Sequence, residues 1–143
     1  MDTTITGIQQ FILAGKSTFT IKNDRTSGRF TYKVDRVENN DGTPKDLWFV
    51  SALTGSDNES SYSYMGLINK NGFRLTKKSK FTPETTSVKG FTWLWNMVTV
   101  KKELPENVKF YHEGRCAKCG RKLTTPESIE AGYGPICIDK MGI

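Results

Sequence analysis

Alternating apolar and polar positions run through residues 18–75 and predict a series of β-strands. Segment 47–53 is apolar at both sets of alternate positions, which is typical of a central strand covered on both faces. Asn71-Gly72 forms a tight-turn pair between two such segments. The segments that carry the pattern are 19–21, 29–37, 47–53, 62–68 and 73–75. We therefore expect an antiparallel sheet of roughly four or five strands.

A helical pattern precedes the predicted strands, in residues 2–15. Thr3 or Thr4 offers an N-terminal cap, and Gly15 offers a stop signal. The apolar residues that share one face of this helix are Ile5, Ile8, Phe11 and Ile12. The spacing predicts a short helix with one buried face.

A second helical pattern occupies residues 90–100 and is apolar on both sides. One side carries Phe91, Leu94, Trp95 and Val98, and the other carries Trp93, Met97 and Val100. Burial against the sheet is the first interpretation. The alternative is that Trp93 and Trp95 are exposed and form a stacking platform for nucleic-acid bases.

The chain has 143 residues, of which 36% are apolar, so it can bury a modest core. No apolar run approaches the roughly 20 residues of a membrane-spanning helix. The first residues lack the basic and apolar stretches of a secretory signal, so we expect a cytosolic chain with no membrane association. We predict an α+β fold, with an antiparallel β-sheet and one or two packed helices in residues 1–105 and a zinc-binding module in residues 106–143.

The zinc module is predicted from four residues spaced H-x3-C-x2-C-x17-C: His112, Cys116, Cys119 and Cys137. Thiolates and imidazole are the ligands that suit tetrahedral Zn²⁺. Asp139 or a water molecule is the alternative fourth ligand, in place of His112. A redox pair of Cys116 and Cys119 is the alternative to metal binding, but the βαβ unit in which such pairs occur is missing from the pattern.

The local sequence around these cysteines is typical of a treble-clef-like zinc module. Cys116-x2-Cys119 with Gly120 after it can form a zinc knuckle. Gly134-Pro135 precedes Cys137 and predicts that this cysteine lies at a helix N-terminus, where free amides stabilise a thiolate.

The net charge is +6, and the basic residues are unevenly distributed. Within 70–90, Glu84 is the one acid among Lys70, Arg74, Lys77, Lys78, Lys80 and Lys89. A second basic set surrounds the cysteines: Arg115, Lys118, Arg121 and Lys122. These residues either form solvated edges that discourage strand aggregation or bind the phosphates of a nucleic acid.

Residues 112–137, which read HEGRCAKCGRKLTTPESIEAGYGPIC, resemble a phage-associated domain family of unknown function. Its members read approximately HEGRC-x2-CGR-x-LT-x-PESI-x2-GIGP-x-C. Tyr133 departs from the small aliphatic residue that is usual there, and it is not a ligand position. The resemblance implies that His112, Cys116, Cys119 and Cys137 bind the metal. It also implies a phage or prophage origin and location in the host cytoplasm, and it implies no agreed activity.

Two functions of different classes follow. The first is a nucleic-acid-binding accessory factor that uses the two basic sets. The alternative is a protein-interaction inhibitor of a host or anti-phage defence enzyme. We do not expect an enzyme, because the chain has one histidine and neither a phosphate loop nor a nucleophile elbow. The sequence does not determine the oligomeric state.

Overall fold

The computed structural model describes residues 5–25, 28–54, 62–112 and 117. In chain order, the elements are α1 (Ile5–Ile12), β1 (Lys16–Asn23), β2 (Arg29–Glu38), β3 (Pro44–Leu53), β4 (Tyr62–Asn69), β5 (Gly72–Arg74), α2 (Thr86–Asn96), the π-helical turn η1 (Met97–Lys101) and β6 (Val108–His112).

The strands form one six-stranded sheet in the order β5-β4-β3-β2-β1-β6, and every neighbouring pair is antiparallel. Phe19 on β1 stands opposite Tyr32 on β2 and opposite His112 on β6. Directly opposed residues project from the same face of a sheet, so the register assigns each strand residue to one of two faces.

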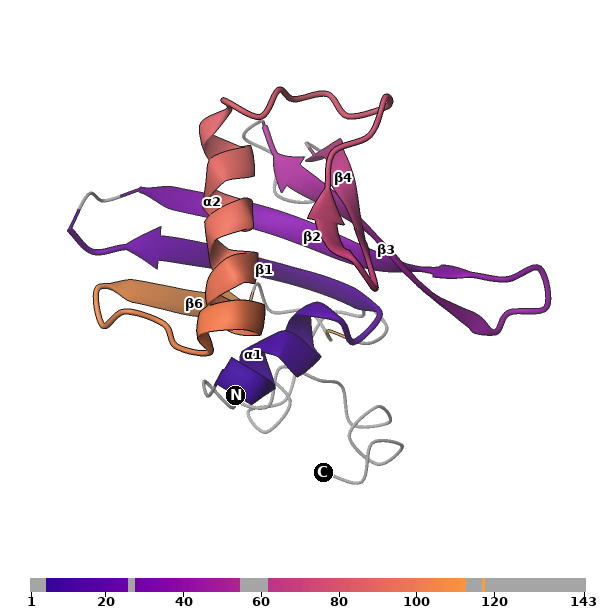
Figure 1. Cartoon of the computed structure of the whole chain (residues 1–143), viewed down its shortest axis with the longest axis horizontal. Helices are drawn as coiled ribbons and strands as arrows, with labels where there is room; N and C mark the ends of the chain where they lie inside the picture. The colour runs from indigo at the N-terminus through magenta and orange to yellow at the C-terminus, as the bar shows by residue number, and fades with distance from the viewer. Residues whose placement is uncertain (1–4, 26–27, 55–61, 113–116, 118–143) are drawn as a thin grey trace.

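The helices pack on one of these faces, which we call the helix face (Figure 1). On α2, the Phe91 ring lies 5.2 Å from the ring of Tyr32 and 4.7 Å from that of Phe73, measured between centroids. From α1, Phe11 meets Phe110 edge to face at 5.6 Å. These contacts tie strands from both edges of the sheet into one hydrophobic core.

A glycine allows α2 to approach the sheet closely. A Cβ atom on Gly90 would lie 2.9 Å from the Tyr32 hydroxyl oxygen and 3.3 Å from the Phe30 ring. The Tyr32 hydroxyl donates a hydrogen bond of 2.7 Å to the carbonyl oxygen of Ser87. Burial raises the pKa of Tyr32 above its ordinary value, so this hydroxyl keeps the proton that it donates.

The α+β prediction is confirmed, with two helices packed on an antiparallel sheet. The sheet has one strand more than the upper expectation, because β6 pairs along β1 at an edge. The strand Val108–His112 is short, and only three of its residues point to the helix face. Two of these three, Val108 and Phe110, are buried.

The two predicted helices are present with different bounds. Ile8, Phe11 and Ile12 are buried on α1, as expected, and Gly15 follows with φ 146°. α2 begins before the predicted segment and gives way to η1 after Asn96. The residues predicted to form its buried side are indeed buried: Phe91, Leu94, Trp95 and Val98.

The two tryptophans of α2 have different environments. Trp95 is 8% exposed and belongs to the core, so its burial is confirmed and its role as an exposed platform is wrong. Trp93 is half-buried at the margin of the core. No helix in the described ranges has both the length and the apolar character needed to cross a bilayer.

Candidate functional site

The second face of the sheet carries most of the charged side chains of the paired strands, and we call it the cationic face. In the described part of the chain, neither helix covers it, because α1 and α2 both pack on the helix face. The register places on it the side chains of Lys16, Lys22, Arg29, Lys33, Arg74 and Lys109, with one carboxylate, Asp35.

Three of these cations form one row across three adjacent strands. Lys22 on β1 stands opposite Arg29 on β2 and opposite Lys109 on β6. Side chains at directly opposed positions have Cβ atoms about 4.5–5.5 Å apart, and like charges placed there destabilise a sheet. An anionic group bound over the row would offset this repulsion.

Aromatic rings accompany the cations on the same face. Phe49 and Tyr111 are 42% and 49% exposed. Phe49 meets Tyr64 edge to face at 5.7 Å, and the Lys33 ammonium group lies 4.7 Å from the centre of the Tyr62 ring. Exposed rings interleaved with cations are the features that bind unstacked bases and their phosphates.

The centre of the cationic face, over β1 and β2, carries buried polar groups. Thr18 and Thr20 are buried there, and the Thr20 and Thr31 hydroxyls are hydrogen bonded at 2.7 Å. Desolvation raises the pKa of Asp35, while Lys33 and Lys16 act in the opposite direction. The exposed groups therefore lie around this centre, with the cation row at one end of the strands.

The predicted basic set of residues 70–80 is exposed but lies mainly outside this face. Among its members, Arg74 stands opposite Leu67 and shares the cationic face. Lys70 lies in the turn between β4 and β5, and Lys77, Lys78 and Lys80 lie in the connection from β5 to α2, all exposed. Arg115, Lys118, Arg121 and Lys122 lie outside the described residues.

Sequence reasoning missed the cation row. In β2, charged and hydroxyl residues alternate with apolar ones from Arg29 to Asp35, and this pattern was a usable signal for one face. The third strand of the row could not be found that way, because β6 pairs with β1 across most of the length of the chain.

Of the four predicted zinc ligands, the structure describes one. His112 ends β6, half-buried, with its ring 6.3 Å from that of Phe11. Cys116, Cys119 and Cys137 lie outside the described residues, as does the alternative ligand Asp139. Within the part of the chain that is described, no group of three or more His, Cys, Asp or Glu side chains could hold a metal.

The structure nevertheless brings the two ends of segment 112–117 to the same part of β1. His112 stands opposite Phe19, and the carbonyl oxygen of Ala117 accepts a hydrogen bond of 2.7 Å from the Lys16 amide. Lys16 and Phe19 are about 10 Å apart along an extended strand. Ala117 is fully buried, so the position that follows Cys116 in the sequence is attached to the sheet.

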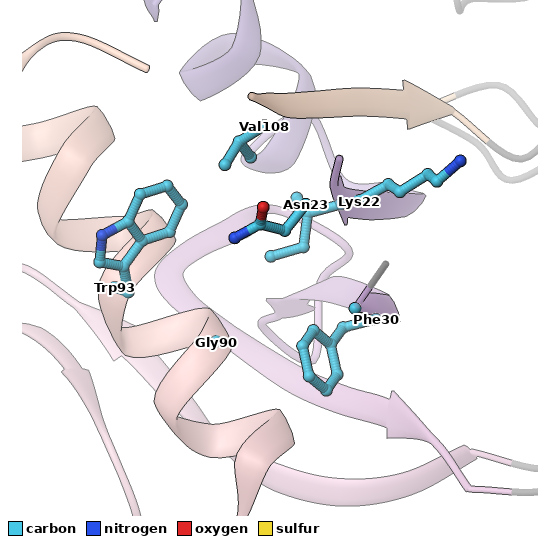
Figure 2. A pocket seen from close by; sticks show the side chains of 8 residues that line it. Lys22, Asn23, Phe30, Gly90, Trp93 and Val108 are labelled. Carbon is cyan, nitrogen blue, oxygen red and sulfur yellow. The ribbon is translucent and has the colours of Figure 1, made fainter. Parts of the chain in front are cut away.

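A pocket of about 260 Å³ opens on the helix face at the same end of the sheet as the cation row (Figure 2). It lies between α2 and the adjoining ends of three strands, β1, β2 and β6. The lining is mostly apolar and consists of Ile21, Lys22, Asn23, Gly28, Phe30, Gly90, Trp93 and Val108.

Comparison with known proteins identifies the C-terminal part alone. Residues 108–142 match a family of unknown function (DUF6011), beginning at the first residue of β6. This match confirms the resemblance of the C-terminal region to a domain family without an assigned function. Neither a curated protein nor a solved structure matches the chain.

Proposed function

We propose that this protein is a non-catalytic accessory factor that binds single-stranded nucleic acid through the cationic face. The observation that carries the proposal is the cation row of Lys22, Arg29 and Lys109, in register across three strands. Phosphates spaced along a nucleic-acid strand neutralise such a row and release condensed counterions, which makes binding favourable and salt-dependent.

The aromatic rings favour a single strand over a duplex. Phe49 and Tyr111 expose their rings on the face that carries the cations. Every unstacked base can stack on such a ring, whereas the bases of a duplex present only their edges. The ligand class is therefore an unpaired strand, bound with little sequence preference.

The proposal includes a zinc site in the C-terminal module, formed by His112, Cys116, Cys119 and Cys137. It is supported by the ligand spacing in the sequence and by the attachment of both His112 and Ala117 to the start of β1. Zinc bound there would have a structural role, holding the module in a defined shape. A phage origin and a location in the host cytoplasm are the setting that we propose for this factor.

Binding of fluorescently labelled oligothymidylate at several salt concentrations tests the function. We expect the logarithm of the association constant to fall linearly with the logarithm of salt concentration, with a slope of about −0.7 for each neutralised phosphate. Lys109→Gln should make this slope shallower by about 0.7. The matched control is Lys101→Gln, an exposed lysine on η1, which should leave the slope unchanged.

Tyr111→Ala tests the stacking component separately. We expect a loss of about 1–3 kcal/mol in binding free energy, with the salt slope unchanged, because stacking involves no counterion release. If the protein binds no oligonucleotide at low salt, the proposed function is wrong.

An acidic protein partner is the alternative ligand of the cationic face, and corresponds to inhibition of a host or defence enzyme. Its support is the same surplus of cations, which fits a carboxylate-rich surface. Capture from host lysate with and without nuclease distinguishes the two. A stoichiometric protein that is retained after nuclease treatment and released by Lys109→Gln would favour the alternative.

A further inference from the structure

We propose that the pocket beneath α2 takes one base of the bound strand, inserted between Trp93 and the ends of β1 and β2. The inference rests on the proposed function and adds to it a binding site with a defined ligand, a single planar nucleobase. Its support is the size and lining of the pocket, a fixed amide donor inside it and a cation at its rim.

The pocket has the dimensions and walls of a site for one ring system. Its volume of about 260 Å³ is just below the range of roughly 300–1,000 Å³ that encloses drug-sized ligands. In Figure 2, the rings of Trp93 and Phe30 lie on opposite sides of Gly90. Two of the lining residues, Gly28 and Gly90, have no side chain to occupy the pocket.

Asn23 supplies a polar group with a fixed orientation. Its side-chain oxygen accepts hydrogen bonds of 3.0 Å from the Arg25 amide and from the Asn107 side-chain nitrogen. Because both of these groups donate, the oxygen of Asn23 must face them and its amide nitrogen must face the other way. Figure 2 shows this nitrogen turned toward Trp93, inside the pocket.

The donor is therefore available to a ligand in the pocket. In the described ranges, Asn23 Nδ2 is not a buried donor without a partner. Its placement therefore carries no penalty for an unsatisfied buried donor in the free protein. A carbonyl oxygen or ring nitrogen on the edge of a base is the acceptor that matches it. A purely aliphatic side chain from a partner protein would leave this donor without an acceptor.

Lys22 connects the pocket to the phosphate-binding row. It lines the pocket at its rim and also stands in the row with Arg29 and Lys109. Figure 2 shows its side chain extending away from Trp93. Consecutive residues of a strand project to opposite faces, so Lys22 and Asn23 place a phosphate contact and a base contact on the two sides of one strand end.

The test compares a ten-nucleotide oligothymidylate with a ten-unit strand of the same backbone in which every site is abasic. Both should bind at low salt through the cationic face. The Asn23→Asp variant keeps an oxygen for the Arg25 and Asn107 donors and replaces the pocket donor by an acceptor. We expect it to weaken oligothymidylate binding about 10-fold, equivalent to about 1.4 kcal/mol, because the acceptor on the base loses its hydrogen-bond donor.

The matched control is Asn71→Asp, which introduces the same charge in the exposed turn between β4 and β5. It should weaken both strands equally and only slightly. Trp93→Leu, which keeps an apolar side chain but removes the ring, should reduce oligothymidylate binding by a similar factor and leave the abasic strand unaffected.

The outcomes separate the two proposals. Failure of both strands to bind the unmodified protein would overturn the proposed function together with the pocket. Equal effects of Asn23→Asp and Asn71→Asp on oligothymidylate would overturn the pocket alone. A third outcome is that Trp93→Leu weakens binding of the two strands equally. That result would count against the pocket, because the abasic strand has no base to insert.

Discussion

Lys22 and Lys109 stand directly opposite each other on β1 and β6, with both side chains on the cationic face. Arg29 extends the same row on the other side of Lys22. Three adjacent cations weaken the sheet in which they lie, since like charges at opposed positions repel. A residue set that lowers stability and concentrates charge is typical of a binding surface rather than of a structural one.

This repulsion leads to a prediction with opposite effects on stability and binding. Lys109→Glu should raise the free energy of unfolding by about 0.2–1 kcal/mol, because it faces Lys22 with an opposite charge. The same change should weaken oligonucleotide binding. Urea unfolding and a binding titration measure the two effects.

The control for Lys109→Glu is Lys101→Glu, which makes the same charge change at an exposed site on η1. It should change neither quantity appreciably. A Lys109→Glu protein that is less stable and binds as well as the unmodified protein would contradict the role of the row.

Removal of the proposed metal should affect the C-terminal module. Native mass spectrometry of the purified protein should show one zinc ion per chain, and Cys119→Ser should abolish it. Structural zinc contributes on the order of 10–16 kcal/mol of apparent binding free energy, so we expect the module of the variant to be unfolded and sensitive to protease. Thr124→Ser, a change in the same region at a position that is not a proposed ligand, should retain the ion. An intact, fully active protein without bound metal would refute the site.

The close approach of α2 to the sheet predicts an unusual effect of alanine in a helix. Gly90→Ala should lower the free energy of unfolding by about 1–3 kcal/mol, because the added methyl group would contact the Tyr32 hydroxyl and the Phe30 ring. At an exposed helical site the same change is stabilising by up to about 1 kcal/mol. Urea unfolding measures the effect. The cost should shrink in the Tyr32→Phe background, and an unchanged cost there would assign the strain to Phe30 instead of Tyr32.

Tyr32 should make stability fall at high pH. Burial raises the pKa of Tyr32 in the folded protein above the value of 10.0 that it has in the unfolded chain. The protonated hydroxyl is therefore compatible with the fold, and no stability is lost below about pH 10. As the pH rises above about 10, the unfolded chain loses this proton while the folded protein keeps it, and the free energy of unfolding decreases by up to about 1.36 kcal/mol per pH unit. Tyr32→Phe, followed by chemical unfolding from pH 8 to 11, should show a smaller decrease. Identical slopes for the two proteins would mean that the ring is accessible to solvent.

The amphipathic helices were predictable because their pattern is local. The spacing of Phe91, Leu94, Trp95 and Val98 places them on one side of any helix, and all four are buried. Trp93 was harder, since the same periodicity allows a buried ring, an exposed ring or the wall of a pocket. Its position opposite Asn23 depends on how α2 crosses the sheet, and helix periodicity carries no information about that.

The basic residues illustrate the same limit for the candidate site. The density of basic residues along the chain pointed to Lys77, Lys78 and Lys80, which are exposed in the connection from β5 to α2. Lys22 and Lys109 are isolated in the sequence and become neighbours only through strand pairing. Counting charges in sequence windows therefore finds loops rich in lysine more readily than faces of a sheet.

The sequence by itself determined the helix faces, the alternating strands and a ligand spacing suited to zinc, because backbone periods and short-range spacings are properties of consecutive residues. Only the tertiary structure decided that β6 pairs with β1 and that Gly90 brings Trp93 over the end of the sheet. Those relationships arise from hydrogen bonding and core packing between segments that are distant in the sequence. Which segments pair depends on how the whole chain folds and not on any local pattern.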